Sequence, residues 1–221
     1  MSVEKLLEPI NKAMDFITDI IKPPIKEISE ILTDKVKYWR FQNQIKILER
    51  AQEYIKSKGY KPNQIPVKTL VPLLDGASLE EDEDMQDRWA ALLANAANPN
   101  NVFSSHIIFV ELLKQLSPYE CIILERMYAG SFLRSSNDLP FFKRIDLIRG
   151  LSIVYKDGNL LIENLLRLSL IEISGAELAT NYDTVDDLMG TDGIYELKID
   201  KDKIKLTTLS VELIRICTLD Q

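Results

Sequence analysis

The side chains that most often perform chemistry are scarce in this sequence, which has one histidine, His106, and two cysteines. A catalytic triad or a multi-histidine metal site would have to be built on His106. Ser104 and Ser105 precede it directly, but adjacent residues at a helix start do not place a hydroxyl against the imidazole. Capping or packing is therefore the favoured role. Cys121 and Cys217 both fall in apolar helical patterns, which predicts buried thiols in a reducing compartment.

Three carboxylates, Glu80, Glu83 and Asp87, have the spacing of one helical face, where they would suit a hard cation. The same residues suit the solvated first turn of a helix, where the helix dipole favours negative charge, and we prefer this interpretation. The sequence has no glycine-rich phosphate loop, no Cys-x-x-Cys motif and no EF-hand glycine among its acidic residues. We therefore predict a protein that is not an enzyme and that uses no metal and no cofactor.

The remaining candidates are basic residues that would bind another macromolecule. They lie on or near two expected helices of the C-terminal half, where a DNA reader would need cations: Lys143, Arg144, Arg149 and Arg167. The formal net charge of −7 opposes broad contact with phosphates. Because an acidic insertion also follows these helices, we favour a protein partner and keep DNA as the alternative.

A C-terminal domain, expected over residues 117–221, positions these basic residues. It begins with Ser117-Pro118-Tyr119-Glu120, which has the form of a capping box with proline at the first helical position. Thr208 is expected to cap a last helix. The apolar spacing predicts further helices over residues 118–129, 140–149 and 159–170.

The same domain has a β pattern between its third and last helices. Residues 171–173 look extended, and apolar residues alternate on either side of 200–203, which predicts a β-hairpin of 195–199 with 204–206. Three helices, a hairpin and a closing helix are the parts of a winged-helix domain. Residues 175–193 form an acidic insertion before the hairpin.

The N-terminal domain, expected over residues 1–116, reads as helical throughout. Apolar spacing predicts an amphipathic helix over 3–21 and a second helix over 24–58, either continuous or broken at Thr33-Asp34. Residues 3–21 would alternatively lie on a membrane surface, but their mixed charge suits anionic lipid poorly, and packing against the long helix is favoured. A homodimer through the long helix stays open, because its heptad pattern is irregular.

Further helices of this domain have sequence signals at their ends. Gly59 is the expected stop of the long helix, and a short helix from about Val67 should end at Gly76. Ser78-Leu79-Glu80-Glu81 reads as a capping box for a helix that continues to Asn98-Pro99. Another helix is expected over about 105–116. Trp39 and Trp89 lie on apolar helix faces, which predicts that both pack in the core.

No stretch of the sequence approaches the roughly 20 consecutive apolar residues of a membrane span. The first residues also lack a basic region followed by an apolar one. We expect a cytoplasmic protein with no integral membrane insertion. Its fold class should be mainly α, with an N-terminal helical domain followed by a C-terminal winged-helix-like domain that carries a small β-hairpin.

Several segments of the chain resemble the bacterial abortive-infection alpha family. They are YWRFQNQIKILERAQEYIKSKGY (38–60), VPLLDGASLEEDEDMQDRWAALLANAANP (71–99), FVELLKQLSP (109–118), ENLLRLSLIE (163–172) and LTTLSVELIRIC (206–217). QDRWAALLANA is the most specific piece, and Ser169 departs from the family form, where glycine is usual. The resemblance implies a role in phage defence, in which an infected cell stops growing or dies before phage is released. It implies no catalytic residues.

Overall fold

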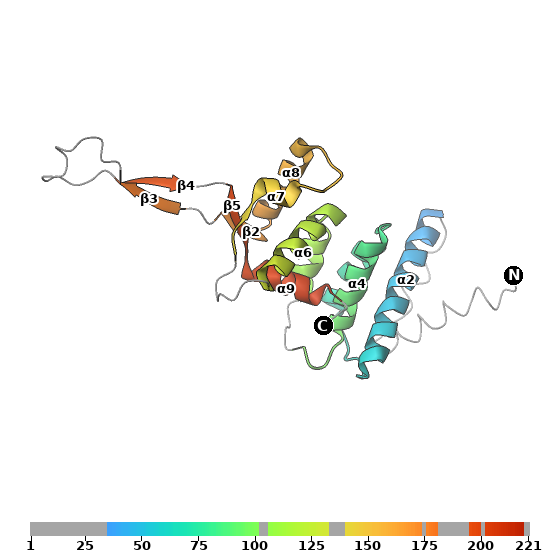
Figure 1. Cartoon of the computed structure of the whole chain (residues 1–221). Helices are drawn as coiled ribbons and strands as arrows, with labels where there is room; N and C mark the ends of the chain where they lie inside the picture. Colours follow the sequence, from blue (N-terminus) through green and yellow to red (C-terminus); the bar gives the residue numbers. More distant parts are fainter. Residues whose placement is uncertain are drawn as a thin grey trace, which may run out of the picture. The chain divides into compact units, whose positions relative to one another are not determined.

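The computed structural model describes residues 35–101, 106–132, 140–173, 176–180, 195–199 and 202–218 (Figure 1). Within these residues the chain is mainly helical with a small antiparallel sheet, as predicted from the sequence. The predicted helix over 3–21, the Thr33-Asp34 break and residues 181–193 of the acidic insertion lie outside the described residues.

Contacts divide the chain into two compact units. The first unit runs to Pro118 and includes the chain from Leu213 onward, and the second unit spans Tyr119–Glu212. The helices that lie wholly within the described part of the first unit are α2 (Lys35–Lys58), α3 (Val67–Ala77), α4 (Glu83–Ala96) and α5 (His106–Leu113). Independent folding of the domains predicted over 1–116 and 117–221 stays a prediction.

Helix α4 is the centre of the first unit, because it contacts α2, α3 and α5. Its buried residues include Trp89 and the run Ala90–Ala94, and the alanines allow neighbouring helices to approach closely. The predicted burial of Trp89 is confirmed, since it is 2% exposed. Trp39 on α2 is 37% exposed, so its predicted place in the core is wrong. Helical spacing alone placed it there, whereas Asn43 is the first buried residue in the part of α2 whose side chains are described.

The predicted capping box at Ser78 is wrong, because α4 begins at Glu83 and its N-cap is Asp82. The Asp82 carboxylate accepts a hydrogen bond from the Met85 N–H at 2.9 Å. Ser78 is fully buried and instead closes α3, donating its hydroxyl to the Asp75 carbonyl at 2.6 Å. Aspartate and serine are about equally good N-caps, so composition could not choose between the two starts.

Polar side chains of α2 hold this end of α3. Arg40 Nε donates to Ser78 Oγ at 2.9 Å, and the Arg40 guanidinium also pairs with Asp75. Asn43 Nδ2 donates to the Ser78 carbonyl at 3.1 Å, and Gln44 Nε2 donates to the Leu74 carbonyl at 3.1 Å. The last carbonyls of a helix have no partner within the helix. The polar residues of this α2 segment therefore have a structural role.

The second unit combines helices with a small sheet. Its elements in chain order are α6 (Pro118–Phe132), β1 (Phe142–Lys143), α7 (Arg144–Ile148), α8 (Tyr155–Arg167), β2 (Ile171–Ile173), β3 (Ala176–Thr180), β4 (Tyr195–Ile199), β5 (Lys203–Leu206) and α9 (Thr208–Ile216), whose last residues belong to the first unit. The predicted start of α6 at Pro118 is confirmed. The helix predicted over 140–149 is correct only from Arg144, because Phe142 and Lys143 form β1 and pair with β5.

The predicted strands 195–199 and 204–206 are present, but their predicted pairing is wrong. Strand β4 pairs antiparallel with β3, which belongs to the predicted acidic insertion. Strand β5 lies between β1 and β2 in a three-stranded sheet of order β1-β5-β2. Ile204 opposes Phe142 on one side and Ile173 on the other. Alternation of apolar residues identifies a strand, but it does not identify the partner of that strand.

Helix α9 begins one residue after its cap, which is Thr207 and not Thr208 as predicted. Thr207 Oγ1 accepts from the Ser210 N–H at 3.3 Å, and Ser210 Oγ accepts from the Thr207 N–H at 3.1 Å. This reciprocal pair satisfies two backbone donors that have no partner within the helix.

Helix α8 ends in a Schellman motif whose left-handed position is a serine. Ser169 has a φ of +55°, its N–H donates to the Leu166 carbonyl, and the Leu170 N–H donates to the Leu165 carbonyl. Glycine is the usual residue at this position, because it has no Cβ to clash. The family resemblance led to the same expectation of a glycine at position 169.

Replacing Ser169 with glycine is expected to raise the free energy of unfolding by about 1 kcal/mol, because the side chain no longer opposes a positive φ. Urea unfolding of both chains followed by circular dichroism measures the change. The matched control is Ser152→Gly at an exposed serine without a positive φ, which should be neutral or destabilising. A lower free energy of unfolding for Ser169→Gly would contradict the presence of backbone strain at Ser169.

Candidate functional site

Two of the four predicted binding residues are held by polar partners on α8. Arg144 is the first residue of α7, its side chain is 14% exposed, and its Nη1 lies 2.7 Å from Glu163 Oε1. Arg167 ends α8 and donates through Nε and Nη2 to Asn164 Oδ1, at 3.0 and 2.7 Å. Asn164 Nδ2 in turn donates to the buried Glu120 carboxylate at 2.5 Å. Both arginine side chains therefore bind acceptors within the protein itself.

The other two predicted residues are exposed. Lys143 ends β1, and Arg149 follows α7 with a side chain that is 75% exposed. Arg149 Nη1 lies 3.6 Å from Asp146 Oδ1, three residues earlier, a spacing that contributes little to stability in water. Arg167 is exposed as well, so of the four only Arg144 lacks the exposure that a phosphate contact needs.

Exposed apolar side chains, which the sequence reasoning did not single out, lie on α7, directly before α8 and in the first half of α8. Val154 is 69% exposed, Leu160 is 60% exposed, and Tyr155 and Ile145 are also exposed. We call these four residues the α7–α8 apolar set. Helix α8 is strongly amphipathic and buries Gly158, Ile162 and Leu165 on its inner side. Leu160 lies on its outer side, and Val154 and Tyr155 are exposed where the helix begins, so these side chains are accessible to a partner.

His106 is buried at the start of α5. Burial lowers the pKa of His106 below its ordinary value, so the neutral imidazole is favoured at neutral pH. Asn101 Nδ2 lies 3.4 Å from His106 Nε2. Ser104 and Ser105 lie outside the described residues. The geometry agrees with packing as the role of this histidine.

Two of the three carboxylates considered for a cation, Glu80 and Asp87, have other partners. Glu80 Oε1 accepts from the N–H groups of Glu81 and Asp82, both at 3.1 Å, and Asp87 pairs with Arg50 at 2.7 Å. Among the described residues, no three His, Cys, Asp or Glu side chains gather as a metal site would require. Both cysteines are buried, as predicted, and neither forms a disulfide.

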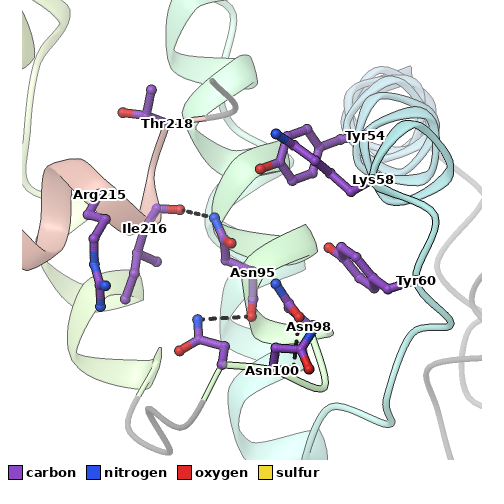
Figure 2. A pocket seen from close by; sticks show the side chains of 10 residues that line it. Tyr54, Lys58, Tyr60, Asn95, Asn98, Asn100, Arg215, Ile216 and Thr218 are labelled. Carbon is purple, nitrogen blue, oxygen red and sulfur yellow. Dashed lines mark hydrogen bonds between the residues drawn. The ribbon is translucent and has the colours of Figure 1, made fainter. Parts of the chain in front are cut away.

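A polar pocket of about 400 Å³ opens in the first unit, where α2, α4 and α9 end (Figure 2). Tyr54 and Lys58 line it from the end of α2, and Tyr60 follows after Gly59. The Lys58 ammonium lies 5.4 Å from the centre of the Tyr54 ring, which is within the range of a cation–π contact. Arg215 lines the opposite side from the end of α9.

Asparagines form the floor of this pocket. Asn95 lies in the last turn of α4, and Asn98, Asn100 and Asn101 lie in the loop after it. Asn95 Nδ2 donates to the Ile216 carbonyl at 2.8 Å, and Asn101 Nδ2 donates to the Asn95 carbonyl at 3.2 Å (Figure 2). The first bond joins the ends of α4 and α9, and the second holds the loop after α4 against that helix. Sequence reasoning read this asparagine-rich run only as a helix stop.

Tyr60 closes the third side of the pocket. Its hydroxyl donates to the Ala94 carbonyl at 3.1 Å, and burial, with a smaller contribution from Tyr54, raises the pKa of Tyr60 to about 12. The hydroxyl therefore stays protonated over the physiological range and remains a donor. The lining holds two cations and no carboxylate: Lys58 and Arg215 stand among tyrosines, asparagines, Ile216 and Thr218.

The family model described as abortive infection alpha matches residues 40–217. The chain belongs to this family, as its resemblance to the family indicated. Comparisons with curated proteins and with solved structures gave no match. Within the described residues, no helix combines the length and apolar character needed to cross a membrane.

Proposed function

We propose that this chain is a non-enzymatic cytoplasmic protein that protects bacteria against phage by binding a protein component of the phage or host. Family membership supports the role in abortive infection. The second unit is the proposed binding module, and α8 is its proposed contact helix. The proposed mechanism involves no chemical reaction, so protection should depend on how much of the partner protein is bound by this chain.

The winged-helix interpretation of the second unit is supported by its element order. Helix α6, strand β1, helices α7 and α8, and strands β2 and β5 follow one another, and β5 inserts between β1 and β2. In this interpretation the pair β3–β4 extends from the sheet as a wing, and α8 takes the place of the recognition helix. The basic residues predicted as binding residues flank this helix.

The composition of α8 supports a protein partner over DNA. A DNA reader places polar and basic residues at the N-terminal end of its recognition helix, where they contact base edges. Here the exposed side chains at that end are Val154, Tyr155, Lys156 and Asp157, and Leu160 is exposed just over one turn later, so apolar side chains make up much of this surface. Exposed aromatic and aliphatic side chains are typical anchors of protein interfaces. This is the observation that carries the proposal.

Replacing Tyr155 and Leu160 together with serine is expected to reduce phage protection at least tenfold while leaving the fold intact. Both side chains are more than half exposed, so their loss should change stability by about 1 kcal/mol or less. Loss of two interface anchors would cost far more binding energy. Plaque counts on lawns that express each chain measure protection, and circular dichroism confirms folding.

The matched control replaces Val67 and Val71 with serine, because these α3 residues are comparably exposed but lie in the first unit. This control should protect like the wild type. Unchanged protection by the folded α8 variant would remove α8 from the mechanism.

DNA binding is the second candidate, and the exposed Arg149 and Lys143 favour it. It requires labelled duplex DNA to gain anisotropy at low salt and to lose it steeply as salt rises. That outcome, together with loss of binding in Arg149→Glu and Arg167→Glu, would replace the protein partner with DNA.

A further inference from the structure

We propose that the polar pocket of the first unit binds the adenine base of a nucleoside, with asparagine carboxamides at the edge of the base and the Tyr60 ring on its face. The pocket volume of about 400 Å³ lies in the usual range of small-molecule sites. Lys58 and Arg215 also line the pocket, but recognition of an uncharged base needs neither of them. The site is independent of the function proposed above, because α8 lies in the second unit.

Two asparagines of the pocket floor are one helical turn apart. The Asn98 N–H donates to the Asn95 carbonyl at 3.3 Å, so the turn that ends α4 includes both residues. Side chains three residues apart in a helix are neighbours, with about 5–6 Å between their Cβ atoms. Both side chains line the pocket (Figure 2). The two carboxamides can therefore contact the same edge of one ligand.

These two carboxamides keep one acceptor and one donor for a ligand. Asn95 Nδ2 donates to the Ile216 carbonyl at 2.8 Å, and Asn98 Oδ1 accepts from the Asn100 N–H at 2.9 Å. Within the described residues, Asn95 Oδ1 and Asn98 Nδ2 have no hydrogen-bond partner. The bonds already present hold both side chains in place before a ligand arrives, which lowers the entropy cost of binding.

An edge of adenine matches this acceptor and donor. Adenine carries an amino donor beside a ring-nitrogen acceptor, and asparagine is one of the residues that usually read this pair. Asn95 Oδ1 would accept from the amino group, and Asn98 Nδ2 would donate to the ring nitrogen. Cytosine also has an amino donor, but carboxylates are its usual acceptors. None of the described lining residues has a carboxylate, so adenine fits better.

Tyr60 supplies a flat surface for the face of the base. Its hydroxyl donates to the carbonyl of Ala94, the residue before Asn95, at 3.1 Å. The loop that carries Tyr60 is also joined to the end of α4, because the Asn63 N–H donates to the Ala97 carbonyl at 2.7 Å. These bonds hold the ring beside the asparagine floor (Figure 2). Aromatic side chains commonly stack on bases in this way.

The test adds adenosine to the isotope-labelled full chain and follows two-dimensional amide NMR spectra. Adenosine at millimolar concentration should shift the side-chain amide signals of Asn95 and Asn98. Purine riboside, which has hydrogen in place of the amino group of adenosine, should bind about tenfold more weakly, which corresponds to about 1.4 kcal/mol. Equal binding of the two nucleosides, or no shift of these amides, would overturn the proposal. Equal shifts with ribose alone would overturn it too.

Tyr60→Leu should weaken adenosine binding about tenfold, because it removes the ring that stacks on the base. The matched control is Tyr60→Phe, which loses the same hydrogen bond to Ala94 but keeps the ring, and it should bind adenosine like the wild type. Equal weakening by both substitutions would exclude stacking on Tyr60. The comparison of adenosine with purine riboside uses the wild-type chain, so it decides the matter even if Tyr60→Leu fails to fold.

The adenine base could come from a free nucleoside or from a single nucleic-acid strand. A trinucleotide of adenosine, added to the same labelled chain, separates these sources. Tighter binding of the trinucleotide than of adenosine would assign the base to a strand, and weaker binding would assign it to a free nucleoside. Both results support an adenine site, whereas binding of the trinucleotide without shifts of the Asn95 and Asn98 amides would contradict it.

Discussion

Replacing Trp89 with alanine should lower the free energy of unfolding by about 3–5 kcal/mol and abolish phage protection. Trp89 is 2% exposed and lies in α4, the helix that contacts α2, α3 and α5. Its ring packs so tightly on α3 that a Cβ added at Gly76 would come within 2.8 Å of it. A domain with a typical free energy of unfolding, about 5–15 kcal/mol, would lose a large part of it.

Thermal and urea unfolding of Trp89→Ala and wild type measure this loss. Trp39→Ala is the matched control, because Trp39 is the same residue type but 37% exposed. The control should cost about 1 kcal/mol or less. Equal effects of the two substitutions would contradict the assignment of Trp89 to the core, and full protection by an unfolded Trp89 variant would exclude a role for the fold.

Replacing Gly158 with valine should destabilise the second unit by about 3 kcal/mol, because α8 has no room for a side chain there. Gly158 is buried, and a Cβ at this position would lie 2.5 Å from Ile148 Cγ2 and 3.0 Å from Ile148 Cγ1. Ile148 is itself buried, so its side chain cannot swing into solvent. The close contact of α7 with α8 therefore requires glycine.

Lys156→Val is the control for Gly158→Val, because Lys156 is exposed two residues earlier in α8 and takes the same β-branched side chain. It separates helix propensity, worth about 0.5 kcal/mol, from the steric clash. Urea unfolding of both variants tests the prediction. Equal stability of Gly158→Val and Lys156→Val would show that α7 moves away from α8 at little cost.

Helix positions were largely predictable, because they depend on local apolar spacing and on proline and glycine. Pro118 begins α6, and Gly59 follows α2 with a φ of +72°. Strand pairing was not predictable in the same way. Strand β4 pairs with β3 and not with β5, although β5 is nearer to it in the sequence. Pairing depends on contacts between segments that are distant in the sequence.

The binding residues show the same limit. The sequence places Arg144 near a recognition helix, but it does not reveal that Glu163, nineteen residues later, neutralises it.

The pocket was missed because its lining comes from three helix ends and a loop. Each of its asparagines, read alone, has the ordinary meaning of a turn residue. Their convergence with Lys58 and Arg215 follows only from packing.

The measurement that tests the central claim most directly is survival of infected cultures that express this chain, with and without the Tyr155→Ser and Leu160→Ser substitutions. Wild type should protect the culture at low phage load and fail at high load, when nearly every cell is infected and stops growing. The α8 variant should collapse at both loads. Survival of wild-type cultures at high load would contradict abortive infection, and equal behaviour of the two chains would contradict protein binding through α8.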